Sequence, residues 1–262
     1  MNAQAPIEVT MVLGDGVTEE ERDRAVLTVR DLASKASRPV IFARVKLLKD
    51  DRRPSDEQAI AQGTLDMSGA VIRAQVAASS IPEAVDLLAM RIQRRMRRIT
   101  EQREDANQRP AATPDGQWRS GDMPTSRPGY YTRPVDERRI VRRKTYAPAA
   151  SSIADALFDL DVLDHRFFLF TDGADGVDAV VFESDDGVKV RRLDGSVPPD
   201  AERFDALGVD NTPAAELSDT EAQERLDVSD SPFIFFRQAG SGRGAVLYRR
   251  YDGHYGLVEP AV

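Results

Sequence analysis

The C-terminal half of this 262-residue chain contains an internal repeat, and no other feature limits the fold as strongly. Residues 152–193 align without a gap with residues 218–259 at a constant offset of 66, and 13 of these 42 positions are identical. The identical positions in the first copy are Ser152, Ala156, Leu160, Asp161, Val162, Asp164, Phe167, Phe170, Gly176, Ala179, Val180, Asp186 and Gly187. The sequence therefore predicts one small fold that occurs twice.

Each copy is predicted to form a helix followed by three strands. Ser152 stands three residues before Asp155, and Ser218 stands three residues before Glu221, which is the spacing of a helix-capping box. The repeated phenylalanines then predict a strand, and the repeated glycine and Asp-Gly pairs predict two hairpin turns. We assign copy one to residues 140–193 and copy two to residues 212–262.

The residues before position 106 follow a different pattern, in the order strand, helix, three strands, helix. Thr18 and Glu21 have capping-box spacing before the first helix, and Ser68-Gly69 suits a hairpin turn. The strands are expected at 7–13, 40–48, 58–67 and 70–78, and the helices at 19–34 and 82–103. The chain is thus predicted to be an α+β protein whose domain 1–105 has the order β-α-β-β-β-α.

Residues 106–139 are rich in proline and glycine and show no apolar periodicity, so we interpret them as a flexible linker. Trp118, Tyr130 and Tyr131 lie within this segment. Aromatic side chains beside arginines can stack on unpaired bases, but aromatics in a linker more often make incidental contacts.

The net charge of −8 is distributed unevenly along the chain. Counted from the sequence, residues 1–105 carry 17 basic and 17 acidic side chains, residues 106–139 carry 6 and 4, and residues 140–262 carry 13 and 23. The three nets are therefore 0, +2 and −10. The acidic half is repelled by nucleic-acid phosphates on average, so phosphate binding is expected in the N-terminal domain.

Five arginines occur within eight residues of the second predicted helix, at positions 91, 94, 95, 97 and 98. Helical spacing is expected to place four of them on an outer face, with only Glu101 and Glu104 near enough to pair along the helix. A solvated helix face with ion pairs is the simpler alternative. With cations from the strands and the first helix they form a predicted rRNA-binding set: Lys35, Arg38, Arg44, Lys46, Arg73, Arg91, Arg94, Arg95 and Arg98.

The sequence contains no recognisable catalytic machinery, so we expect a binding protein without a cofactor or a metal. It has no cysteine, and its two histidines, His165 and His254, stand outside any ligand-type spacing. The acidic run TDGADGVD lacks the EF-hand pattern, and GSGRG lacks the Lys-Ser/Thr of a phosphate loop, so both are interpreted as turns. Neither a secretory signal nor a long apolar run is present, which favours a cytoplasmic location.

Two segments resemble the C-terminal domain of long ribosome hibernation-promoting factors. IVRRKTY at residues 140–146 is similar to the start of that domain, and YRRYDGHYGLVEP at residues 248–260 is similar to its end. Copy one keeps the start and has a degraded end, whereas copy two has VDNTPAAEL in place of the start and keeps the end. The element order of residues 1–105 also resembles the S30AE/YfiA-like domain of this family, which has a double-stranded-RNA-binding-like fold.

The resemblance implies a function on the ribosome. The family's N-terminal domain binds the small subunit in the channel for mRNA and tRNA through 16S rRNA, and so blocks translation while it protects idle 70S ribosomes. Doubled factors of this type resemble those of actinobacteria that are linked to dormancy or hypoxia. In long members the C-terminal domain dimerises between two chains and links two ribosomes into 100S particles.

The complementary degeneration of the two copies suggests that they pair within one chain as a pseudo-dimer. Phe167, Phe170, Phe233 and Phe236 are the predicted interface residues. The protein would then be a monomer that holds single ribosomes, with no membrane partner. Two alternatives remain open: a protein-interaction regulator of transcription of the sigma-54-modulation type, and a general binder of double-stranded RNA.

Overall fold

The computed structural model describes residues 7–108, 133–146, 150–204 and 206–261. The protein is a mixed α+β chain of two compact units, which hold mainly the residues before and after the segment 109–132. Within the described ranges, none of the helices combines the length and apolarity of a membrane-spanning helix. Most of the predicted linker, with Trp118, Tyr130 and Tyr131, lies outside the described residues.

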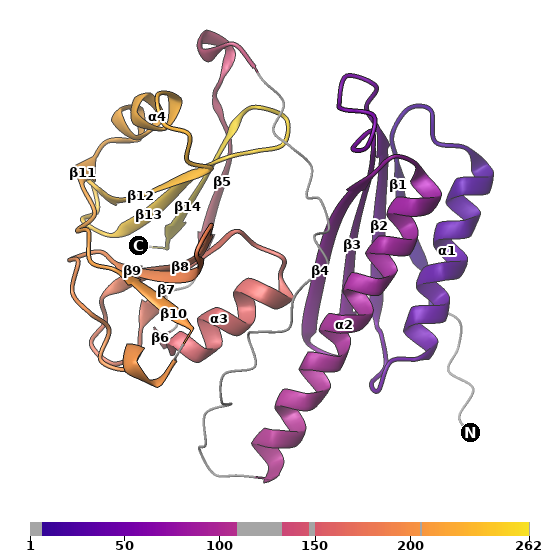
Figure 1. Ribbon diagram of the computed structural model, residues 1–262, viewed down its shortest axis with the longest axis horizontal. Helices are drawn as coiled ribbons and strands as arrows, with labels where there is room; N and C mark the ends of the chain where they lie inside the picture. The colour runs from indigo at the N-terminus through magenta and orange to yellow at the C-terminus, as the bar shows by residue number, and fades with distance from the viewer. Residues whose placement is uncertain (1–6, 109–132, 147–149, 205, 262) are drawn as a thin grey trace. The chain divides into compact units, whose positions relative to one another are not determined.

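The N-terminal unit has the element order that the sequence predicts (Figure 1). Its elements are β1 (Val9–Leu13), α1 (Glu19–Ser34), β2 (Phe42–Lys49), β3 (Ala59–Met67), β4 (Ala70–Ala78) and α2 (Ile81–Gln108). The strands form one sheet in the order β1-β2-β3-β4, in which β1 runs parallel to β2 and the other pairs are antiparallel. Helix α2 continues five residues beyond the predicted end at residue 103.

Local sequence signals account for the boundaries of these elements. The Glu21 amide donates to Thr18 Oγ1 at 3.2 Å while the Thr18 amide donates to Glu21 Oε2 at 2.8 Å, which confirms the predicted capping box of α1. Ser68 and Gly69 have φ angles of 51° and 92°, as the tight turn between β3 and β4 requires.

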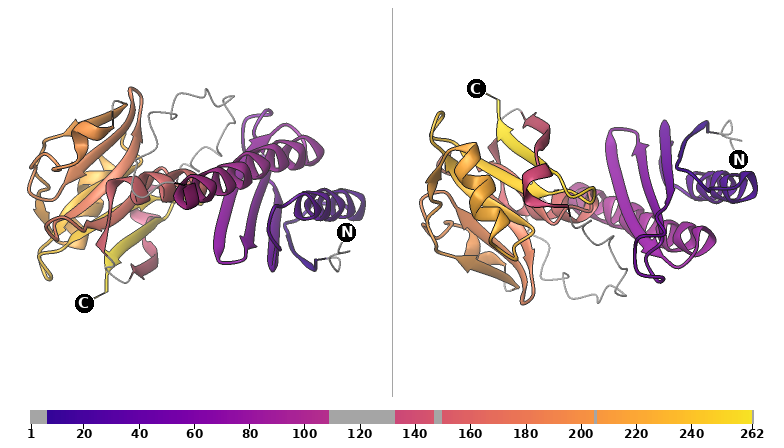
Figure 2. Two further views of the ribbon diagram at one scale, coloured as in Figure 1. Left: turned by 90° about the horizontal axis from the view of Figure 1, so that it is seen from below. Right: turned by 90° about the horizontal axis from the view of Figure 1, so that it is seen from above.

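Both helices of the N-terminal unit pack against one face of the sheet and against each other (Figure 2). Ala43, Val45 and Leu47 of β2 are fully buried, whereas Phe42 and Arg44, which alternate with them, are exposed. This alternation confirms the predicted half-buried strand, although Ile41 lies just before the strand and is exposed. The opposite sheet face carries no helix of this unit within the described residues.

The C-terminal unit contains two five-stranded sheets (Figure 1). The first copy contributes β6 (Ala150–Ser151), α3 (Ile153–Val162), β7 (Phe167–Asp172), β8 (Asp178–Ser184) and β9 (Gly187–Arg192). The second contributes β11 (Glu216–Leu217), α4 (Asp219–Asp227), β12 (Phe233–Gln238), β13 (Gly244–Arg249) and β14 (Tyr255–Pro260). The predicted helix and three strands are present in both, and a short strand precedes each helix. Two short 3-10 helices, η2 (Val135–Glu137) and η3 (Ala201–Arg203), complete the unit.

The two sheets exchange their outermost strands. Strand β5 (Ile140–Tyr146) begins the first copy in sequence but pairs in parallel with β14 of the second copy. Strand β10 (Leu207–Asp210) precedes the second copy but pairs in parallel with β9 of the first. The sheet orders are therefore β10-β9-β8-β7-β6 and β11-β12-β13-β14-β5.

This exchange corrects the predicted organisation of the second copy. Copy two was expected to begin at residue 212 without an opening strand, but β10 occupies the positions that match β5 at the offset of 66. The segment has weak strand-forming residues, Gly208 and Asp210 among them, so only its pairing with β9 reveals it as a strand.

Candidate nucleic-acid interface and the interface between the repeats

Three of the predicted cations lie on the sheet face opposite the helices. Arg44 of β2 is opposite Thr64 of β3, and Thr64 is opposite Arg73 of β4. Directly opposed residues point to the same side of a sheet, so Arg44 and Arg73 share a row. Lys46, two residues after Arg44, belongs to the next row on the same face. Among the described residues, no ion pair joins Arg44 or Arg73 to a carboxylate.

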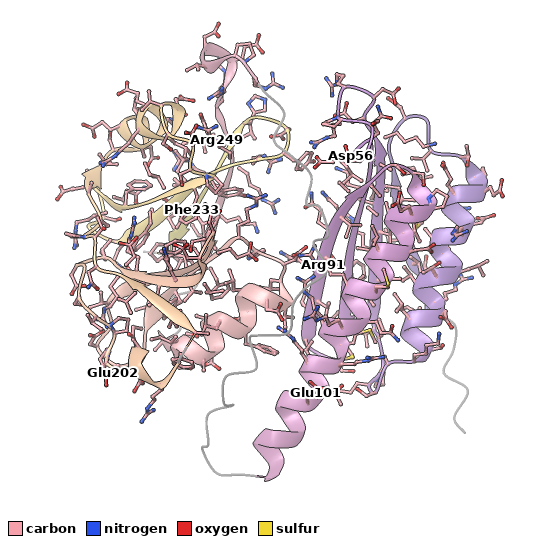
Figure 3. All side chains as sticks on the ribbon, viewed as in Figure 1. Asp56, Arg91, Glu101, Glu202, Phe233 and Arg249 are labelled. Atoms are coloured by element: carbon pink, nitrogen blue, oxygen red, sulfur yellow. The ribbon has the colours of Figure 1, made fainter. Side chains whose placement is uncertain are left out.

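Two arginines of α2 lie at the β4 edge of this sheet. Arg91 Nη1 donates to the Gln75 carbonyl at 3.5 Å, and Arg95 Nη1 donates to the Arg73 carbonyl at 3.0 Å. Strand β4 is the last strand of the sheet, so these guanidinium groups bind carbonyls at its edge. Arg91 is labelled on α2 in Figure 3.

The prediction that Arg95 lies on an outer helix face was wrong. Arg95 follows Ile92 by three residues and precedes Ile99 by four, and both isoleucines are buried. Residues at these spacings share one side of a helix, so Arg95 lies on the packed stripe and reaches the sheet. Arg94 and Arg98 follow Arg91 by three and seven residues and lie on the side of α2 that Arg91 occupies.

The two remaining predicted cations, Lys35 and Arg38, follow the end of α1. Lys35 Nζ pairs with Asp31 Oδ2 at 2.5 Å, one helical turn earlier. Arg38 Nη2 donates to the Ser68 carbonyl at 3.3 Å, which places Arg38 beside the turn between β3 and β4. The structure thus gathers Arg44, Lys46 and Arg73 on one sheet face and leaves Lys35 apart, at the C-terminal end of helix α1.

A hydrophobic cluster joins the two sheets of the C-terminal unit. Phe167 and Phe233 meet there with ring centroids 5.1 Å apart, and Phe233 is labelled in Figure 3. These two residues occupy matching positions of the repeat. The other ring pairs are Phe167 with Tyr248 at 5.4 Å and Phe182 with Phe233 at 5.5 Å, and they exchange when 66 is added or subtracted. Such reciprocal contacts are the signature of a twofold interface, here within one chain.

Phe170 and Phe236 were wrongly predicted to lie in this interface. Phe170 packs in a core with α3 of its own copy, and Phe236 packs in a core with α4. Residues three apart on a strand point to opposite faces, so Phe170 cannot share the face of Phe167. Leu169 and Phe235, two residues after Phe167 and Phe233, occupy the interface instead.

Sequence reasoning also missed an ionic contact between the two copies. Asp178 at the start of β8 accepts from Arg243 Nε at 2.7 Å and Nη2 at 2.8 Å, and from the Gly244 amide at 2.8 Å. Burial raises the pKa of Asp178, but the hydrogen bonds from Arg243, Gly244 and Thr171 outweigh it, so this pKa lies below its usual value of 3.8. The two partners come from TDGADGVD and GSGRG, each interpretable alone only as a turn. No group of three potential metal ligands occurs among the described residues.

Comparison with known proteins connects these repeats to a family. The family described as "Sigma 54 modulation/S30EA ribosomal protein C terminus" matches the chain twice, at residues 135–188 and 209–257. The predicted resemblance is confirmed. The first match to the S30EA C-terminal family begins just before β5, and the second begins within β10. Each match therefore includes at its start a strand that pairs with the other copy.

Individual proteins are also similar to this chain. The dormancy associated translation inhibitor of Mycobacterium tuberculosis is 28% identical over 214 residues, which cover 79% of this chain and 72% of that protein. A ribosome hibernation promotion factor of Bradyrhizobium diazoefficiens is 43% identical over 49 residues, which cover 19% of this chain and 24% of that protein. The crystal structure of the Protein Y N-terminal domain of Thermus thermophilus is 18% identical in sequence, and its TM-score is 0.30. The comparison covers 36% of this chain and 99% of that one.

Proposed function

We propose that this protein is a ribosome hibernation factor that inhibits translation. In this proposal the N-terminal unit binds the small ribosomal subunit in the mRNA and tRNA channel through 16S rRNA and stabilises idle 70S ribosomes. The names of the two curated relatives, a translation inhibitor and a hibernation promotion factor, support this class of function. The ribosome is a cytoplasmic partner, and the protein acts by binding without a cofactor.

The single observation that carries the proposal is the row of cations on the open sheet face. Arg44 and Arg73 lie in one row with Lys46 beside them, on the face that carries no helix of the N-terminal unit. A flat surface with clustered cations suits contacts with rRNA phosphates, whereas the C-terminal half is acidic. Contacts with about six phosphates would lower the affinity roughly a thousandfold between low and moderate salt.

A binding competition tests the proposal. Labelled protein is sedimented with 30S subunits over a salt series, with and without an excess of a plain RNA duplex. We expect salt-sensitive co-sedimentation that the duplex does not displace. Displacement by the duplex would instead indicate a general double-stranded-RNA binder, and the absence of co-sedimentation would refute the proposal.

One alternative is favoured by the family description, which includes sigma-54 modulation. A protein-interaction regulator of transcription would bind a transcription factor and would tolerate charge reversal at Arg44 and Arg73. Binding of the purified chain to sigma-54 in the absence of ribosomes, unaffected by those reversals, would support this alternative.

We further propose that the two copies close on each other as a pseudo-dimer within one chain. Strands β5 and β10 complete the sheet of the opposite copy, and the aromatic cluster joins the two sheets. A surface that is occupied in this way cannot recruit a second chain, so we expect single 70S particles and no 100S ribosome dimers.

A further inference from the structure

The interface between the copies is symmetric in its aromatic residues but asymmetric at one point. Positions 178 and 244 match at the offset of 66, and they meet directly, since the Gly244 amide donates to Asp178 Oδ2 at 2.8 Å. The first copy has Val177-Asp178 at this point and the second has Arg243-Gly244. A carboxylate on one side therefore faces an arginine and a glycine on the other.

The carboxylate of Asp178 is held from both copies. Arg243 of the second copy binds both of its oxygens, at 2.7 and 2.8 Å, and Thr171 of the first copy donates to Oδ1 at 2.9 Å. The Asp178 side chain is only 2% exposed. Arg243 is 37% exposed, so Asp178 is the buried partner of the pair. Removal of Arg243 leaves this buried carboxylate uncompensated, which is costly in a protein interior.

The space between positions 178 and 244 also admits a side chain on one side only. A Cβ atom on Gly244 would approach the Asp178 Cβ to 2.8 Å and a ring carbon of Phe235 to 2.9 Å. Only one of the two facing positions can carry a side chain, so two identical residues other than glycine cannot occupy both in the present arrangement.

We propose that Asp178, Arg243 and Gly244 make each copy specific for the other, so that the first copy pairs only with a second copy. Two first copies would place two buried carboxylates and two Cβ atoms against each other. Two second copies would place two arginines across a gap between two glycines. The chain thereby rejects like-with-like pairing with another molecule. The expected absence of ribosome dimers rests on the proposed function. The pairing specificity itself does not, and its test requires no ribosome.

Charge-exchanged full-length chains test this specificity. Arg243→Asp gives a chain with acids on both faces, and Asp178→Arg gives a chain with bases on both. Each alone is expected to lose about 10 °C in Tm. When the two variants are unfolded and refolded together, light scattering is expected to show a two-chain complex, because acid and base meet only between the chains. Arg203→Asp, at the exposed pair with Asp200, is the matched control and should keep the wild-type Tm and mass.

An unchanged Tm of Arg243→Asp, or a purely monomeric mixture of folded variants, would overturn the proposal. If Asp178→Arg fails to fold, a double-mutant cycle with Asp178→Asn and Arg243→Gln decides the question. Coupling predicts that the double variant loses no more Tm than the more damaging single variant. Additive losses would show that the two residues act independently and would refute the pairing role.

Discussion

Arg44 and Arg73 are the residues on which the proposed rRNA contact most directly depends. We predict that Arg44→Glu with Arg73→Glu weakens 30S binding at least about tenfold and reduces the slope of log affinity against log salt by about 2, one for each lost phosphate contact. Filter binding over a salt series measures both quantities.

A matched control is available on the helical side of the same unit. Arg22→Glu with Arg30→Glu produces the same change in charge on α1, where Arg22 already pairs with Glu19 and Asp23. This control should retain most of the affinity. Equal losses in both double variants would mean that net charge, and not the sheet face, determines binding.

Tyr146 makes the stability of the C-terminal unit sensitive to alkaline pH. Burial, with a smaller contribution from the charge of Asp178, raises the pKa of Tyr146 from 10.0 to about 12. A raised folded-state pKa means that the contribution of Tyr146 to stability is constant below pH 10 and falls between pH 10 and about 12, where only the unfolded phenol ionises. Urea unfolding at pH 9 and pH 11 should show a smaller loss for Tyr146→Phe than for wild type. Equal losses would contradict the assigned pKa.

Side-chain periodicity decides which single residues could be predicted from the sequence. The capping pair Thr18 and Glu21 depends only on local spacing and is found where expected. The predictions for Arg95 and Phe170 were wrong, because the helical period places Arg95 beside Ile92 and Ile99 and the strand period places Phe170 on the face opposite Phe167. The Asp178 contact with Arg243 joins residues 65 positions apart, and no local pattern indicates it.

The second repeat helix, α4, offers a test at the level of one element. The Glu221 amide donates to Ser218 Oγ at 3.3 Å and the Ser218 amide donates to Glu221 Oε2 at 2.8 Å, so both ends of the capping box are formed. Ser218→Ala should reduce the free energy of unfolding by about 1 kcal/mol. Chemical denaturation measures the change, and Thr220→Ala, at an exposed side chain in the first turn of α4, is the control. An equal effect of both substitutions would contradict the assigned cap.

Strand β5 provides a second test at this level, because it completes the sheet of the other copy. Arg138, just before β5, pairs with Asp227 at the end of α4 and also contacts Tyr255 of β14. A fragment of residues 150–262 should therefore lose amide protection in β14, whereas a fragment of residues 133–262 should keep it. Hydrogen exchange on both fragments measures this difference. Full protection of β14 without β5 would refute the importance of the exchange.

The repeat predicted the elements of each copy but not which strands pair. The sequence offset of 66 places β5 with the first copy and β10 with the second. Each strand nevertheless pairs in parallel with a strand of the other copy, and nothing in the sequence of either copy indicates this pairing. For the same reason, the degraded start of copy two was expected to contain no strand, although β10 is present there.

At the level of the whole molecule, the two copies of the repeat contact each other within one chain. The exchanged strands, the aromatic cluster and the Asp178 contact with Arg243 all lie between two copies in one chain. A single chain whose two copies pair with each other has one predicted rRNA-binding face. We therefore expect it to bind one ribosome at a time.

Sucrose-gradient sedimentation of purified ribosomes with the full-length protein tests this central claim most directly. We predict that the protein migrates with 70S particles, in about equal amounts, while the 100S region stays empty. Abundant 100S particles that contain the protein, or the absence of protein from the 70S peak, would contradict it.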